Sequence, residues 1–125
     1  MSSVLSAATP LAGRRVLVVE DDALIGMLLE EMLTDMGAEV TGIAATLPEA
    51  MLLADTPADA AIVDVNLAGQ PSYAAAERLA ARGVPLLFAT GNDRHAPPAS
   101  LAAAPTLAKP YDFAQVEAAL TGLLA

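Results

Sequence analysis

The chain has 125 residues, a formal charge of −9 at pH 7, 55% hydrophobic residues, no cysteine and one histidine. This length fits one domain with a core of useful size, and the composition differs from the polar, highly charged kind that stays disordered. The lack of cysteine and the single histidine argue against a disulfide framework and a zinc site. The negative charge has the wrong sign for nucleic acid or an anionic membrane.

No apolar run reaches the ~20 residues that span a bilayer, and residues 1–13 lack the basic start and unbroken apolar stretch of a signal peptide. We therefore expect a soluble, cytoplasmic protein. Residues 1–13 show no hydrophobic period, so we predict a flexible leader there and one folded domain over residues 14–125. Met1 and a complete final helix before Ala125 favour a whole protein over a fragment.

The first predicted elements are a strand at 16–19 and a helix at 23–36. The strand is an unbroken run of valine and leucine, which is typical of a parallel strand covered on both faces. In the helix, apolar residues recur at helical spacing, and Gly37 suits the left-handed conformation that ends a helix. Asp22 is expected to cap its first turn.

The same alternation of strand and helix continues to the end of the chain. Residues 95–104 interrupt it, because two prolines and a thin apolar face predict only a short or mobile helix there. The order predicts an α/β fold, in which five parallel strands carry helices on both faces. The remaining strands are expected at 39–43, 60–63, 85–89 and 106–108, and the remaining helices at 48–54, 73–82 and 113–124. Gly83 is expected to end the helix at 73–82.

Polar residues follow four of the five predicted strands. In open parallel sheets, ligands bind beyond the carboxyl ends of the strands, so these residues are candidates for a functional site. They are Glu20, Asp21 and Asp22 after the first strand, Asp64 and Asn66 after the third, Thr90 after the fourth and Lys109 after the fifth.

Crowded carboxylates raise one another's pKa unless a cation relieves them, and Mg²⁺ suits carboxylates completed by a carbonyl and water. The Lys109 ammonium and the Thr90 hydroxyl can meet oxygens of an anionic group, and an aspartate in such a cage can attack a phosphoryl group. Alone, Glu20 and Asp21 also fit a solvated loop. A site is favoured by Asp64, which ends an apolar strand, and by Lys109, the only lysine in the chain.

Four segments resemble the receiver domain of two-component response regulators: 16–22, 62–64, 88–91 and 107–111. The resemblance runs from about Arg14 to the C-terminus. It implies a (βα)₅, flavodoxin-like fold with strand order 2-1-3-4-5 and a cis bond before Pro110. It further implies Asp64 as phosphoacceptor, Thr90 as switch hydroxyl and Lys109 as a phosphoryl contact. The implied Mg²⁺ ligands are Glu20, Asp21, Asp64 and the backbone carbonyl of Asn66.

Residues 84–91 and 64–67 look like the stand-alone receivers that carry a P-F-x-F-A-T-G-Y signature. That likeness implies a histidine kinase of the HWE or HisKA2 type as partner. Asn92 and Leu86 depart from the signature, where it has tyrosine and phenylalanine. Thr106 stands where most receivers have an aromatic residue, so the usual coupling of threonine and aromatic ring cannot operate, and the proline-rich segment becomes the candidate mobile element.

We therefore expect a monomeric response regulator that accepts a phosphoryl group on Asp64 from a histidine kinase or a phosphotransfer protein. It would signal to a downstream protein through a surface change, or act as a phosphate relay or sink. It is not expected to be an enzyme beyond assisting its own phosphoryl transfer and dephosphorylation. Two alternatives are an aspartate-nucleophile phosphatase, against which Asn66 and the lack of a cap argue, and a pseudo-receiver that only binds proteins.

Overall fold

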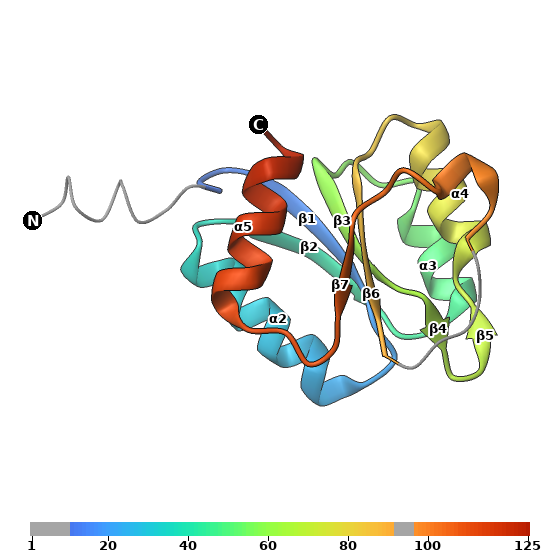
Figure 1. The fold of residues 1–125 in the computed structure, drawn as a ribbon, viewed down its shortest axis with the longest axis horizontal. Helices are drawn as coiled ribbons and strands as arrows, with labels where there is room; N and C mark the ends of the chain where they lie inside the picture. The colour runs from blue at the N-terminus through green and yellow to red at the C-terminus, as the bar shows by residue number, and fades with distance from the viewer. Residues whose placement is uncertain (1–10, 92–96) are drawn as a thin grey trace, which may run out of the picture.

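The computed structural model describes residues 11–91 and 97–125, in which one parallel sheet is flanked by helices (Figure 1). The strand order is β2-β1-β3-β6-β7, which confirms the 2-1-3-4-5 order expected of the sheet. The register is parallel throughout this sheet. Its strands are β1 (Arg15–Val19), β2 (Glu39–Ala44), β3 (Ala60–Asp64), β6 (Leu86–Thr90) and β7 (Thr106–Ala108).

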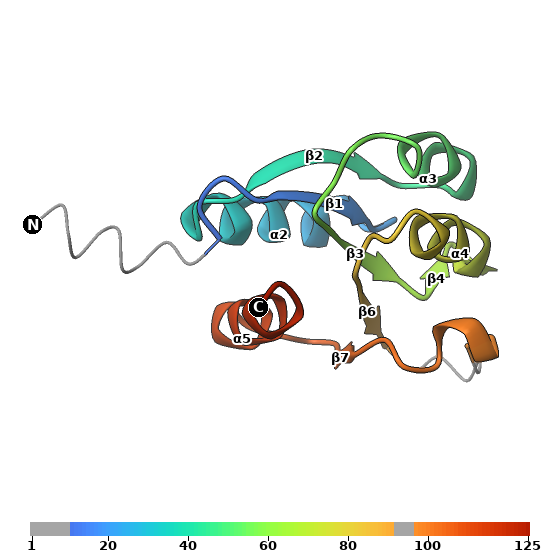
Figure 2. The ribbon, with the colours of Figure 1, turned by 90° about the horizontal axis from the view of Figure 1, so that it is seen from above.

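Helices cover both faces of the sheet (Figure 2). Alternate residues of each strand point to opposite faces, so Val16 and Val18 pack under α2 and α5, whereas Leu17 and Val19 pack under α3 and α4. This explains the unbroken apolar run in β1, since both of its faces are buried. The helices are α2 (Ala23–Asp35), α3 (Leu47–Leu53), α4 (Tyr73–Ala81) and α5 (Phe113–Leu123).

The helix ends follow the expected chemistry. Asp22 caps α2, because its Oδ1 accepts hydrogen bonds from the N–H groups of Leu24 at 2.9 Å and Ile25 at 3.1 Å. Gly37 follows α2 with φ 89°, and Gly83 follows α4 with φ 78°, conformations that favour glycine. The structure thus confirms the predicted cap and both predicted helix stops.

Two arginines connect α4 to the end of α3: Arg78 within α4 and Arg82 at its C-terminal cap. Arg78 forms an ion pair with Asp55 at 2.8 Å. The Arg82 guanidinium donates to the backbone carbonyl of Ala54, which caps α3, and to that of Thr56 at 3.1 Å. The carbonyls at the end of α3 are therefore satisfied by a side chain from the following helix.

The folded part of the chain begins earlier than residue 14. Leu11 is 1% exposed and packs in the core beneath α2 and α5. Its N–H donates to the carbonyl of Met36, and that of Gly13 to the carbonyl of Gly37, both at 3.2 Å. The prediction of a flexible leader over residues 1–13 is therefore wrong for Leu11, while residues 1–10 lie outside the described residues.

Two further segments differ from the expected elements. Between β3 and α4 the chain forms a small antiparallel hairpin that was not predicted, made of β4 (Asn66–Leu67) and β5 (Gln70–Pro71). The segment that was expected to form a short helix contains one 3₁₀ turn, η1 (Ala99–Leu101), within residues 97–104. The rest of that prediction, from residue 95, lies outside the described residues. No described helix is long and apolar enough to span a bilayer.

Candidate functional site

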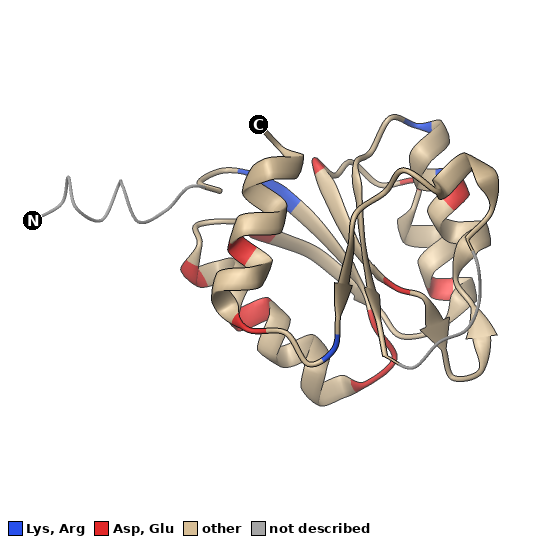
Figure 3. Ribbon diagram, in the orientation of Figure 1, with Lys and Arg blue, Asp and Glu red and all other residues tan. Residues whose placement is uncertain are grey.

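The candidate site lies where β1, β3 and β7 end (Figure 3), at the carboxyl edge of the sheet. Lys109 Nζ donates to Glu20 Oε1 and to Asp64 Oδ2, each at 2.9 Å. Glu20 and Asp64 are only 2% and 5% exposed. The ammonium group of the residue after β7 therefore bridges two buried carboxylates, one directly after β1 and one at the end of β3.

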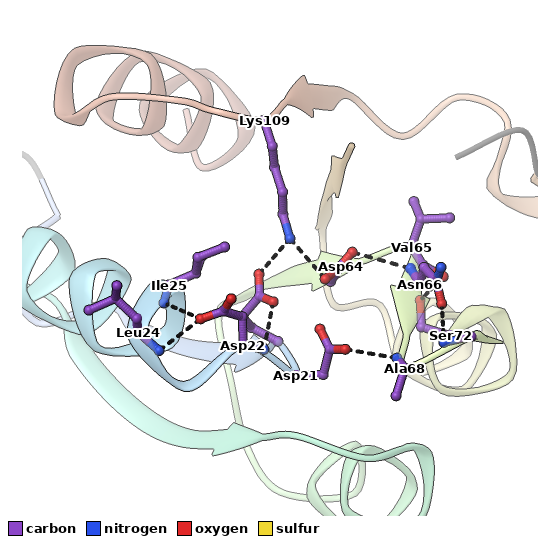
Figure 4. A network of polar contacts seen from close by, with 12 residues as sticks. Asp21, Asp22, Leu24, Ile25, Asp64, Val65, Asn66, Ala68, Ser72 and Lys109 are labelled. Atoms are coloured by element: carbon purple, nitrogen blue, oxygen red, sulfur yellow. Dashed lines mark hydrogen bonds and ion pairs between the residues drawn. The ribbon is translucent and has the colours of Figure 1, made fainter. Parts of the chain in front are cut away.

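Asp21 completes an acidic cluster at the same edge (Figure 4). Carboxylate oxygens of Glu20, Asp21 and Asp64 all lie within 4.8 Å of one another. Asp21 is exposed, and its Oδ2 accepts a hydrogen bond from the N–H of Ala68 at 2.8 Å. Three oxygen ligands at this spacing fit a hard divalent cation such as Mg²⁺, which prefers carboxylate and carbonyl oxygens.

Backbone hydrogen bonds fix the residues from which these side chains project. Glu20 N–H donates to Ala44 O at 2.8 Å, which extends the β1–β2 ladder by one residue. Lys109 N–H donates to Thr90 O, also at 2.8 Å, and so ties the end of β7 to the end of β6. The side chains therefore stand on sheet ends whose positions are set by the core.

The burial of charge at this edge changes how the side chains titrate. Burial raises the pKa of Glu20 to about 7, and the negative charge of Asp64 adds to it, although hydrogen bonds from Asp22 N–H and Lys109 oppose the rise. Burial alone would lower the pKa of Lys109, but its hydrogen bonds to Asp64 and Glu20 raise it above its usual value. The lysine thus stays charged while Glu20 holds its proton more tightly than an exposed glutamate.

Asp21 titrates in the opposite direction. Burial raises the pKa of its carboxyl, but the hydrogen bond from Ala68 N–H, followed by hydrogen bonding with Glu20, outweighs that effect and lowers the pKa below its ordinary value. Asp21 is therefore an anion over the whole physiological range. The edge combines one permanent cation, one permanent anion and two buried carboxyl groups, an arrangement that can hold both a metal cation and an anionic oxygen.

The other residues predicted from the sequence lie beside this cluster. Thr90 is half-buried at the end of β6 and pairs with Ala108 of β7. Asn66 begins the hairpin, and its N–H donates to Asp64 Oδ1 at 3.2 Å. The Asp22 carboxylate caps α2, while the Asp22 N–H donates to Glu20 Oε2 at 3.0 Å. Thr106 is exposed at the start of β7.

Sequence reasoning missed two residues at this edge. Ala68 carries no functional side chain, so only its backbone N–H brings it to the site. Tyr111 follows the cis peptide bond between Lys109 and Pro110, and its hydroxyl is buried without a hydrogen-bond partner among the described residues. Burial raises its pKa to about 12. An aromatic residue directly after Lys-Pro was the available signal for Tyr111.

Tyr111 also lines an apolar cavity between α2 and the end of β7. The cavity has a volume of about 290 Å³. Lys109, which is hydrogen-bonded to Glu20 and Asp64, lines the cavity too. Its walls are formed by Ile25, Leu28, Met32, Lys109, Pro110 and Tyr111.

Solved structures with a similar fold and sequence cover nearly the whole chain. SdrG from Sphingomonas melonis Fr1 is 38% identical, with 90% of this chain and 98% of SdrG covered and a TM-score of 0.78. The REC domain of the response regulator PhyR from Erythrobacter litoralis is 25% identical, with 91% and 92% covered and a TM-score of 0.75. The receiver domain of the sensor histidine kinase PA1611 from Pseudomonas aeruginosa PAO1, which has a magnesium ion in its active site cleft, is 28% identical, with 90% and 98% covered and a TM-score of 0.76.

A shorter similarity links the chain to a curated protein. The transcriptional regulatory protein PdtaR of Mycobacterium tuberculosis is 40% identical over 72 residues, which make up 57% of this chain and 35% of PdtaR. The match therefore spans about a third of the length of that relative. No family model matches the chain.

Proposed function

The chain belongs to the receiver domains of response regulators, and on that premise we propose that it accepts a phosphoryl group on Asp64 from a histidine kinase or a phosphotransfer protein. The observation that carries the proposal is the position of Asp64. It is buried at the end of β3, bonded to Lys109 and within a cluster with Glu20 and Asp21. Burial of a carboxylate is costly, and the single Lys109 ammonium is shared between Asp64 and Glu20 with Asp21 close by, so the cluster favours a functional site over a purely structural ion pair.

In the proposed reaction, an Asp64 carboxylate oxygen attacks phosphorus. The bond between phosphorus and the donor's histidine nitrogen breaks, its electron pair stays on that nitrogen, and the nitrogen takes a proton from water. The product is an acyl phosphate on Asp64. Lys109 Nζ lies 2.9 Å from Asp64 Oδ2, so it can donate to an oxygen of the transferred group. We assign the Thr90 hydroxyl to a second phosphoryl oxygen.

Glu20, Asp21 and Asp64 are the side chains that would hold Mg²⁺, with the Asn66 backbone carbonyl as a further ligand. When bound, the ion supplies positive charge that offsets the repulsion between these carboxylates and an incoming phosphoryl group. The solved receiver domain of PA1611 holds a magnesium ion in its active site cleft, which supports the assignment. Glu20 must give up its proton to bind, and Lys109 then remains as the protein's own cation at the site.

The output is proposed to be a change of surface that a downstream protein reads, or passage of the phosphoryl group onward. The likeness of residues 84–91 to the P-F-x-F-A-T-G-Y signature supports a kinase of the HWE or HisKA2 type as donor. Hydrolysis as the main activity is disfavoured, because Asn66 replaces the second acid of aspartate-nucleophile phosphatases. Its side-chain oxygen instead accepts a hydrogen bond from Gly69 N–H at 2.7 Å.

Phosphoryl transfer from candidate kinases in the presence of Mg²⁺ tests the proposal. The native chain should gain one phosphoryl group by intact mass, both from a cognate kinase and from a small acyl phosphate. Asp64→Asn should gain none, and a chelator should prevent the reaction. Asp35→Asn makes the same change at an exposed aspartate of α2 and should react like the native chain. A phosphoryl adduct on Asp64→Asn would refute the assignment.

A further inference from the structure

The β4–β5 hairpin reaches the candidate site through one backbone group. The N–H of Ala68, at the hairpin tip, donates to Asp21 Oδ2 at 2.8 Å (Figure 4). Ala68 lies 47 residues beyond Asp21 in sequence. The hairpin therefore connects the exposed carboxylate after β1 with the segment that follows Asp64.

Asp21 differs from the two other carboxylates in how it is held. Glu20 and Asp64 are buried, and each is bonded to the Lys109 ammonium. Asp21 is exposed, so packing does little to restrict rotation of its side chain. The bond from Ala68 supplies a restraint, because it fixes one oxygen of the carboxylate against the protein backbone.

Further contacts within the hairpin and with the core support that restraint. Asn66 Oδ1 accepts from Gly69 N–H at 2.7 Å, and Ser72 N–H donates to Val65 O at 3.0 Å across the base. Leu67 is 3% exposed and anchors β4 in the core. Three different contacts thus hold the turn in place.

The turn also contains a strained residue. Ala68 has φ 52° and Gly69 has φ 88°, the pair of positive values found in two-residue type I′ hairpins. The left-handed conformation is unfavourable for alanine. An alanine keeps it only where the surrounding structure holds the backbone in place. In this conformation the Ala68 N–H meets Asp21.

We propose that the β4–β5 hairpin is a positioning element for Asp21: the Ala68 amide orients that carboxylate for the divalent cation and thereby sets the affinity for Mg²⁺. This inference rests on the proposed function, and Ala68 and Gly69 act through Asp21 rather than on the cation. Groups that hydrogen-bond to metal-ligating side chains typically change metal affinity by about 10- to 100-fold when they are lost.

The test compares two glycines in the same conformation. Gly69→Ala and Gly83→Ala each place a Cβ at a positive φ, and neither Cβ would meet any atom within 4 Å. Both variants should lose similar thermal stability. In a titration with MgCl₂ followed by backbone amide NMR shifts, Gly69→Ala should bind Mg²⁺ about tenfold more weakly than the native chain, whereas Gly83→Ala should match it.

A second measurement applies even if Gly69→Ala does not fold. In Asp21→Ala, the Ala68 amide proton should move upfield and exchange faster with solvent than in the native chain. Equal Mg²⁺ affinity in Gly69→Ala and the native chain, or an Ala68 amide that does not respond to Asp21→Ala, would overturn the role of the hairpin. A native chain that shows no Mg²⁺ shifts and no phosphorylation would instead overturn the proposed function.

Discussion

The carboxyl edge of the sheet and the crossover from β6 to β7 are adjacent, since both include or follow Thr90. The two regions are stabilised by different kinds of contact. At the edge, Lys109 bridges two buried carboxylates at 2.9 Å. Within residues 97–104 of the crossover, Leu101 is the buried side chain, and the exposed Ser100 hydroxyl donates to Glu77 Oε2 at 3.1 Å. The comparison separates two tasks: strand ends fix the groups of the candidate site, and the lightly packed residues 97–104 can rearrange at low cost.

The crossover from β3 to β6 differs from the crossover from β6 to β7 in how much apolar surface it buries. Helix α4 connects β3 to β6 and buries Ala75, Ala76 and Leu79 against the sheet. The described part of the next crossover buries only Leu101, from a single 3₁₀ turn. A segment with less buried apolar surface opens more readily, so a conformational response should be found after β6 rather than in α4.

Removal of Lys109 should have the largest effect, because Lys109 forms both ion pairs at the carboxyl edge. Lys109→Ala loses a charge-assisted contact to the phosphoryl group worth about 1.5 to 3 kcal/mol, so a phosphoryl mimic such as beryllofluoride should stabilise the variant by about that much less than it stabilises the native protein. Without the mimic, the variant should still fold, with some loss of stability because two carboxylates lose their partner. Thermal melts with and without the mimic measure both effects.

Arg78→Ala is the matched control for that experiment, because it removes an exposed cation that is paired with Asp55 away from the edge. It should gain as much stability from the mimic as the native chain. A Lys109→Ala protein that gains equally would show that Lys109 does not contact the phosphoryl group.

The pH dependence of stability should report the buried glutamate. Its pKa is about 7 in the folded protein and 4.5 in the unfolded chain, so between these values the folded state binds more protons. The free energy of unfolding should therefore fall as pH rises through this window, by about 2 kcal/mol. Urea unfolding at pH 5 and pH 8 with a chelator measures the change.

Glu20→Gln should flatten that profile, because the glutamine does not titrate. The lowered pKa values of Asp21, Asp55 and Asp59 act only in more acidic solution, where their stabilisation is lost, and so do not mask the effect. A native protein whose stability rises between pH 5 and pH 8 would contradict the assigned environment of Glu20.

Backbone amide exchange should show the response of the crossover. A phosphoryl mimic should slow exchange within residues 97–104 by about tenfold, equivalent to about 1.4 kcal/mol, and leave the amides of β1 and β3 unchanged. Thr106 is exposed, so it should show no rotation of a buried side chain. Changes confined to α5, or full protection of residues 97–104 without the mimic, would argue against the crossover as the responding element.

The smallest effect is expected at Ser100. Ser100→Ala removes one exposed hydrogen bond to Glu77, so the free energy of unfolding should change by less than about 0.5 kcal/mol. Chemical denaturation measures it. A loss of 2 kcal/mol or more would mean that the crossover is held by polar contacts as firmly as the edge, and the contrast between the two regions would fail.

The parts of the structure that were predicted correctly are those with strong local patterns. Runs such as Val16–Val19 and Ala60–Val63 mark buried parallel strands, and the acids directly after them fall at one edge because parallel strands share their direction. Asp22, Gly37 and Gly83 have side-chain or backbone preferences that depend little on the rest of the fold. Those preferences therefore appear in the sequence itself.

The missed features leave no clear local pattern in the sequence. The hairpin strands have two residues each, too few for a hydrophobic alternation, and alanine at its first turn position hides the Asn-Gly signal of such turns. Leu11 is an isolated apolar residue whose burial depends on packing beneath α2. The Asp21–Ala68 bond involves a backbone N–H, which every residue except proline carries, so no residue type announces it.

The arginine that caps α3 also constrains the order in which the polypeptide can fold during its synthesis. Helix α3 has seven residues, too few to persist as an isolated helix in water. The carbonyl of Ala54, at the end of this helix, accepts its hydrogen bond from Arg82, which lies 28 residues farther along the chain. Until Arg82 has left the ribosome, that carbonyl lacks its side-chain donor, so we expect α3 to become stable on the sheet only after α4 has been synthesised.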